Sequence, residues 1–99
     1  MPDKEPHSKT KTSFYRRLYV AHLIHTGTNT VPAICEATGM HRRTAQDTIQ
    51  ALLELDIKCE FMGEKRNGNY AISDWGPIQP KWISKNVKLV KDVLQYPWL

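Results

Sequence analysis

One short segment carries most of the structural information in this chain: residues 39–52 read Gly39-Met40-His41-Arg42-Arg43-Thr44-Ala45-Gln46-Asp47-Thr48-Ile49-Gln50-Ala51-Leu52. Its apolar residues recur at i, i+4, i+7 and i+8, which is the spacing of a single helix face: Ala45, Ile49, Leu52 and Leu53. The segment therefore predicts a helix that begins at His41 or Arg42, runs to about Leu55 and has a polar opposite face.

A shorter helix is expected immediately before this one. Thr30 and Val31 are β-branched, and Pro32 sits where a first helical turn tolerates a proline. Residues 33–38 follow as a short helical stretch, and Gly39 is the residue type that ends helices. Residues 31–55 thus read as two helices joined by a tight glycine turn.

Downstream of the second helix, the apolar period changes from helical to two. This alternation is typical of β-strands with one buried face, and the inward positions are Ile57, Cys59, Phe61, Tyr70 and Ile72. The connection contains Asn67-Gly68, a hairpin turn signal, next to the cations Lys65 and Arg66. Residues 57–75 therefore predict a β-hairpin with a basic tip.

The flanks complete a single domain. Residues 1–12 hold no apolar residue after Met1 and are expected to form a flexible arm, with Ser13 as the N-cap of a helix over residues 14–25. That helix is apolar almost all round, which predicts packing partners on more than one side. Pro80 opens a last amphipathic helix over residues 80–95, whose broad apolar face includes Trp82.

This order of elements resembles a winged helix-turn-helix. Residues 39–52 are similar to the regulator pattern of Gly, an apolar residue, a cap, two variable positions, Thr and a small apolar residue, with Ile49 and Leu52 at its later apolar positions. The layout is similar to short bacterial winged-helix proteins of the multiple-antibiotic-resistance regulator type. The resemblance implies an α+β, mainly α fold over residues 13–99, with the helix-turn-helix at 31–55 and the wing at 57–75.

The resemblance also implies double-stranded DNA binding and transcriptional regulation. One helix fits the major groove, which is about 12 Å wide. Arginine binds guanine, glutamine binds adenine, and threonine contacts a phosphate or a thymine methyl group. The residues of suitable type on the outer face of the predicted recognition helix are Arg42, Arg43, Thr44, Gln46, Asp47 and Gln50, and those at the wing tip, which reach a minor groove or the flanking backbone, are Lys65 and Arg66.

Asp47 departs from the family pattern, in which a basic or neutral residue is common. A carboxylate at this position either accepts from cytosine N4 or pairs with Arg43 four residues earlier on the same helix face. We favour the helix pairing. The negative charge of Asp47 weakens the expectation of a direct phosphate contact at this position.

The formal net charge of +4 lies at the two ends of the chain. Residues 1–17 hold five basic and two acidic residues, residues 18–75 hold five and seven, and residues 76–99 hold four and one. Composition therefore permits a polyanionic partner without arguing for one. The near-neutral middle favours an alternative in which the winged helix is a protein-interaction or assembly module that does not bind DNA.

No catalytic, metal or cofactor site is expected. The chain has no CxxC or HExxH spacing, no glycine-rich phosphate loop and no nucleophile signature around Cys35 or Cys59, which read as small core residues. It has no apolar run long enough for a membrane span and no signal peptide. The sequence predicts a cytoplasmic protein that is not an enzyme.

The first and last helices offer more apolar surface than one small domain needs. A two-fold homodimer through these helices would bury it and would suit palindromic DNA sites. We expect this homodimer; the alternative is that the two helices pack on each other within one chain.

Overall fold

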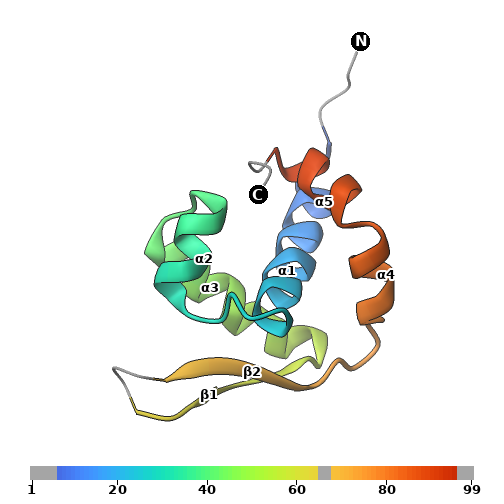
Figure 1. Ribbon diagram of the computed structural model, residues 1–99. Helices are drawn as coiled ribbons and strands as arrows, with labels where there is room; N and C mark the ends of the chain where they lie inside the picture. Colours follow the sequence, from blue (N-terminus) through green and yellow to red (C-terminus); the bar gives the residue numbers. More distant parts are fainter. Residues whose placement is uncertain (1–6, 65–67, 96–99) are drawn as a thin grey trace.

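The computed structural model describes residues 7–64 and 68–95. Helices and two strands follow one another in the winged-helix order (Figure 1). The elements are α1 (Lys9–His25), α2 (Val31–Thr38), α3 (Arg42–Leu52), the 3-10 turn η1 (Leu53–Leu55), β1 (Lys58–Met62), β2 (Asn69–Asp74), α4 (Pro80–Lys85) and α5 (Val87–Leu94). The predicted α+β, mainly α fold is confirmed.

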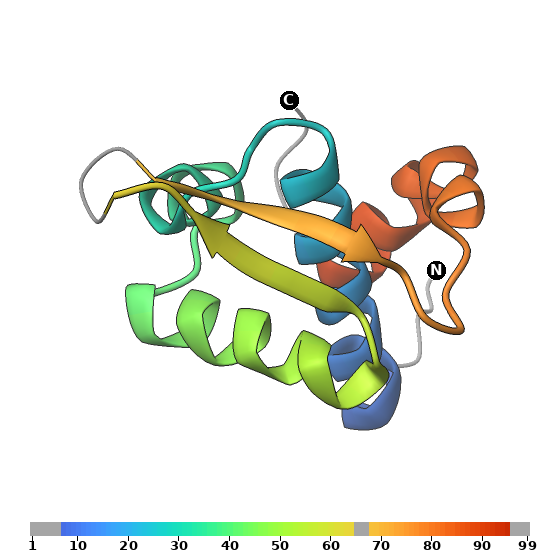
Figure 2. The same cartoon turned by 90° about the horizontal axis from the view of Figure 1, so that it is seen from below.

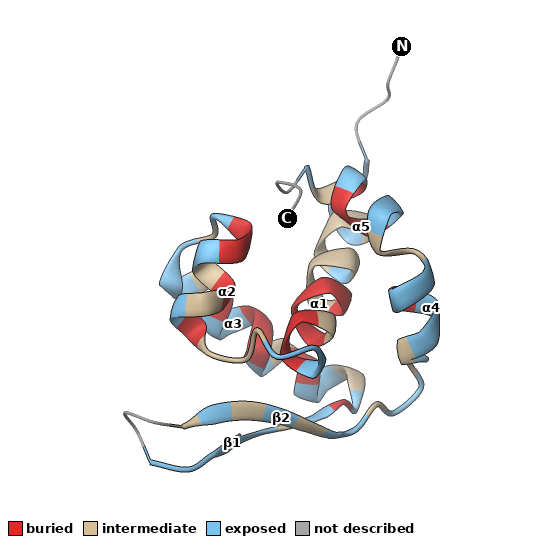
Figure 3. Cartoon of the chain, in the orientation of Figure 1, coloured by how far each residue is buried: buried red, intermediate tan, exposed pale blue. Residues whose placement is uncertain are grey.

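Helix α1 is the centre of the fold. Its second half is almost entirely buried, and Figure 3 shows this as a red segment surrounded by the other elements. Helices α3, α4 and α5 and strand β2 all pack against it. The buried residues cover most of its circumference: Leu18, Tyr19, Val20, Ala21, Leu23 and Ile24. The expectation that this helix packs on more than one side is confirmed, and the partners belong to the same chain.

The start of α1 differs from the prediction. The N-cap is Ser8, whose Oγ atom accepts a hydrogen bond from the backbone N–H of Lys11 at 3.1 Å. The predicted cap at Ser13 is therefore wrong, and residues 9–12 of the expected flexible arm are helical. Once the buried part of a helix has formed, each added turn costs little, and a serine cap satisfies an otherwise unpaired N–H group.

Helices α2 and α3 form the predicted helix-turn-helix. The Thr30 side chain caps α2 by accepting from the backbone N–H of Ala33 at 3.2 Å. Gly39 ends α2 in the left-handed region, at φ +80°, and its N–H donates to the Cys35 carbonyl at 2.7 Å. This cap turns the chain sharply into α3, and the last predicted turn of the second helix is the 3-10 turn η1.

Strands β1 and β2 form the predicted antiparallel hairpin, and Figure 2 shows it crossing in front of the helices. Cys59 pairs with Ile72, and Phe61 pairs with Tyr70. The backbone N–H of Tyr70 donates to the carbonyl of Asn29 at 2.8 Å, which fastens the hairpin to the loop between α1 and α2. Phe61 is 44% exposed, so its predicted place in the core is wrong: β1 extends past the helices at this point.

The predicted helix over residues 80–95 is two helices. Asn86 separates α4 from α5, and its side-chain amide donates to the Trp82 carbonyl at 2.8 Å. Asparagine competes with the backbone for hydrogen bonds, which favours a helix end. The break lets Ile83 of α4 and Val90 of α5 both be buried, and both helices pack on α1. Trp82 is 41% exposed, so the broad buried face expected of one long helix is only partly realised.

None of the helices in the described part of the chain combines the length and the apolarity that crossing a bilayer requires.

Candidate nucleic-acid interface

Helix α3 divides into a buried face and an exposed face. The buried face is formed by Ala45, Thr48, Ile49 and Leu52. Of the predicted contact residues on this helix, Thr44 is half-buried, and the exposed ones are Arg42, Arg43, Gln46, Asp47 and Gln50. The structure thus presents a row of hydrogen-bonding side chains to solvent on a helix held by α1 and α2.

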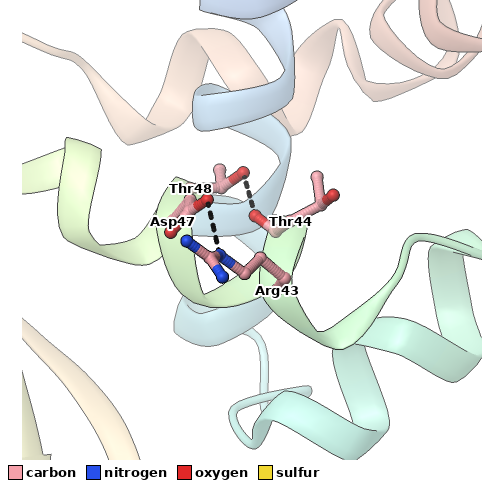
Figure 4. A network of polar contacts seen from close by, with 4 residues as sticks. All are labelled: Arg43, Thr44, Asp47 and Thr48. Atoms are coloured by element: carbon pink, nitrogen blue, oxygen red, sulfur yellow. Dashed lines mark hydrogen bonds and ion pairs between the residues drawn. The ribbon is translucent and has the colours of Figure 1, made fainter.

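Arg43 and Asp47 form the ion pair expected from their spacing. The Nε atom of Arg43 lies 3.9 Å from the Oδ2 atom of Asp47, and the side chains are 89% and 73% exposed (Figure 4). An exposed pair of this kind contributes about 0.2–1 kcal/mol, so a stronger ligand displaces it at small cost. The ion pair therefore orients the Arg43 guanidinium and leaves it free to bind another partner.

Thr44 sits at the edge of the exposed face. Its carbonyl accepts from the Thr48 hydroxyl at 2.7 Å, a helix-internal bond drawn in Figure 4. The Thr44 side chain lines a shallow depression between α3 and α1, opposite Arg16 and Arg17. These two arginines are not among the residues that the sequence predicts. Their adjacency in the basic first block of the chain is the sequence signal that could have identified them.

The wing contributes the other predicted contacts. Lys65 and Arg66 lie in residues 65–67, outside the described part of the chain. The strands on either side of them are described: β1 pairs with β2, and β2 is bonded to Asn29 through the Tyr70 N–H. Near the tip, Met62 and Glu64 are exposed.

The two cysteines are half-buried free thiols that pack against the core. Burial raises the pKa of Cys59 to about 11, and the charge of Glu60 adds to the effect. A thiol with so high a pKa stays protonated at neutral pH and is a poor nucleophile. Among the described residues, no three His, Cys, Asp or Glu side chains gather as metal ligands.

Comparison with known proteins agrees with this geometry. A family model described as winged helix-turn-helix matches residues 9–94, and the chain belongs to this family. The chain is also similar to a crystal structure of a DUF2131 family protein from Shewanella amazonensis SB2B. The two are 35% identical, the match covers 92% of this chain and 91% of that chain, and the TM-score is 0.85. Among curated proteins, no match was found.

The family suggests nucleic-acid binding, and winged-helix domains are typically not enzymes.

Proposed function

We propose that this protein binds double-stranded DNA in a sequence-specific manner and regulates transcription in the bacterial cytoplasm. The observation that carries the proposal is the exposed face of α3, where arginine, glutamine and threonine side chains project from a helix presented by a helix-turn-helix. A helix so presented fits the major groove, and its side chains then meet base edges.

Each side chain on that face has a distinct role in the proposed complex. Arg42 and Arg43 donate to guanine O6 and N7, and Gln46 pairs with adenine. Gln50 lies one turn further along the same exposed face and reads a neighbouring base. Thr44, at the edge of the face, contacts a phosphate or a thymine methyl group. A good bidentate contact discriminates between bases by about 1–3 kcal/mol.

The wing supplies sequence-independent affinity in this proposal. Lys65 and Arg66 lie in the connection between β1 and β2, and β2 is fastened to the body of the domain by the hydrogen bond from the Tyr70 N–H to the Asn29 carbonyl. A hairpin held in this way carries its tip to the DNA beside the recognition helix. Cations there neutralise backbone phosphates and anchor the protein on any sequence.

We further propose a homodimer through α1 and the last helices. Most of the apolar circumference of α1 is covered by its own chain, which removes much of the surface that suggested a dimer. What stays exposed is smaller and includes Phe14 of α1 and Trp82 of α4, at 37% and 41%. A two-fold axis at this place would pair two α3 helices, as palindromic sites with half-sites about 34–36 Å apart require.

The test is selection of bound sequences from a random duplex pool, followed by titration at two salt concentrations. Wild-type protein is expected to enrich one sequence and to bind it with steep salt dependence. Arg43→Ala should relax the preference at one base position, whereas Lys65→Ala with Arg66→Ala should weaken binding to all sequences alike. Wild-type selectivity and affinity in both variants would refute the assignment of this face.

A second candidate function is protein binding without DNA. Two observations favour it: Asp47 contacts the arginine best placed to read bases, and an apolar groove of about 360 Å³ opens between α1 and the segment leading into α4. The groove is lined by Phe14, Tyr15, Leu18, Pro77, Ile78, Gln79 and Trp82. Absence of DNA binding even at low salt, together with a stable complex that Trp82→Ala abolishes, would favour this candidate.

A further inference from the structure

Helix α1 is the most basic element of the described chain. It carries Lys9, Lys11, Arg16 and Arg17 in its first half and no acidic residue anywhere. Helix α3 carries Arg42 and Arg43 offset by Asp47. The helix expected to enter the groove is thus less positive than the one that packs beside it. The excess charge of α1 has no role in the core, because the buried residues of α1 lie in its second half.

The two arginines of α1 face α3. Ser13, Arg16 and Arg17 line one side of a depression of about 210 Å³, and Thr44, Asp47, Thr48 and Ala51 line the other. Figure 2 shows the amino-terminal part of α1, in blue, beside the α3–η1 segment. A second depression on the outer side of α1 shares the same Ser13, Arg16 and Arg17 and continues to Lys9. The basic side chains therefore form one continuous surface that adjoins the recognition helix.

The Arg17 guanidinium of this surface is held by a hydrogen bond within α1. Arg17 donates from Nη1 to the hydroxyl oxygen of Ser13, one turn earlier in α1. Both arginines are half-buried, and within residues 7–64 and 68–95 neither forms an ion pair. Two adjacent, partly desolvated cations with no ion-pair partner among the described residues favour the approach of an anion.

The size of the depression beside α3 and the hydrogen-bond donors that line it indicate which type of anion it binds. Small-molecule sites usually have volumes of about 300–1,000 Å³ and mostly apolar walls. The depression beside α3 is smaller and its walls are polar. Arginine side chains flanked by hydroxyl groups are the usual donors to phosphate oxygens. Such a site suits single phosphate groups of an extended polyanion.

We propose that residues 9–17 of α1 bind the DNA phosphate backbone at the edge of the major groove that receives α3. The proposal rests on the proposed function and extends it, because it assigns a second anchoring surface in addition to the wing. Arg16 and Arg17 contact consecutive phosphates and set the depth of α3 in the groove, and Lys9 continues the contact along the strand. These contacts carry no base information.

The test compares two double variants of the full chain that remove the same charge. One is Arg16→Gln with Arg17→Gln, and the matched control is Lys81→Gln with Lys85→Gln, two exposed lysines of α4. For the arginine pair we expect roughly a tenfold or greater loss of affinity on every duplex, with the slope of log K against log salt reduced by about 1.8. The selected sequence should stay the same. The lysine double variant should lose much less affinity for DNA and keep the wild-type slope of log K against log salt.

Equal losses in the two double variants would overturn the proposal while leaving the proposed function intact. Failure of the wild-type protein to bind any duplex would overturn both. A measurement on the wild-type protein guards against a folding defect: the Nε–H resonances of Arg16 and Arg17 are expected to shift when duplex DNA is added. Resonances that do not move at saturating DNA would equally contradict the contact.

Discussion

The carboxylate of Asp47 lies 3.9 Å from the guanidinium of Arg43, one helical turn away on the exposed face of α3. This pair occupies the centre of the surface that we assign to DNA. It orients an arginine toward solvent and at the same time places a negative charge where phosphates approach. Its net effect on binding follows from which of these two contributions is larger.

Asp47→Asn is expected to raise the affinity for duplex DNA by about threefold to fivefold. The pair is exposed, so the orientation that it provides is worth less than about 1 kcal/mol, and the amide removes a repulsive charge beside Arg16, Arg17 and Arg43. Fluorescence anisotropy at constant salt measures the change. Glu54→Gln on η1 is the control, since it removes one charge from an exposed residue that does not line this depression. An equal gain in both variants would mean that only net charge matters.

Gly76→Ala is expected to destabilise the fold more than Gly39→Ala. Both glycines have positive φ, at +57° and +80°, so an alanine costs about 1 kcal/mol at either place. Only at Gly76 does the added Cβ also meet a backbone atom, the Asp56 carbonyl oxygen at 2.5 Å. Urea unfolding should give a further loss of about 1–2 kcal/mol for Gly76→Ala. Equal midpoints for the two variants would contradict the close approach of these segments.

The stability of the fold is expected to fall as the pH drops below about 6.5. Burial lowers the pKa of His22, with added repulsion from His25 and Lys91, so the folded protein favours neutral His22. The unfolded chain takes up the proton at the ordinary pKa of 6.5, and each step below that pH therefore favours unfolding. The fall in stability between neutral and acidic pH should be smaller in His22→Gln, whereas His7→Gln, at an exposed residue, should keep the wild-type pH dependence. Urea midpoints of the three proteins at about pH 7.5 and 5.5 measure the difference.

Alkylation of Cys59 by iodoacetamide is expected to be slow and steeply pH-dependent. Its pKa of about 11, against an ordinary 9.0, lowers the thiolate fraction at pH 8 by about 100-fold. In a Cys35→Ala variant, the rate should rise about tenfold per pH unit up to about pH 10. When the same variant is unfolded in urea, its alkylation rate should level off at a pH near the ordinary thiol pKa of 9.0. A plateau below pH 9 in the folded protein would show that Cys59 is not buried as described.

Local patterns account for the parts of the fold that were predicted. Gly39 takes the left-handed conformation that a turn between two helices requires, and the period of Ala45, Ile49 and Leu52 marks the buried face of α3. The i,i+4 spacing of Arg43 and Asp47 places them on one face of the helix. The contact residues on α3 and at the wing tip stay predictions, because their role depends on a partner.

The parts that could not be predicted depend on packing between distant segments. Ser8 and Ser13 are equally good caps, and where α1 begins depends on how far its buried half supports the helix. Asn86 interrupts a pattern that reads as one amphipathic helix, and on either side of this break α4 and α5 both pack on α1. The apolar circumference of α1 is consistent both with a dimer interface and with a helix at the centre of one domain. The contacts of α1 with α3, α4, α5 and β2 show that it is the central helix.

Capping, turn chemistry and helical period act over a few neighbouring residues, so the helix-turn-helix, its glycine turn, the hairpin and the two faces of α3 could be predicted from local sequence. The position of Arg16 and Arg17 beside Thr44 and Asp47, in contrast, is set by the packing of the folded chain. No local pattern relates residues so far apart in the chain. Their proximity follows from the burial of α1 against α3, which is a property of the whole core.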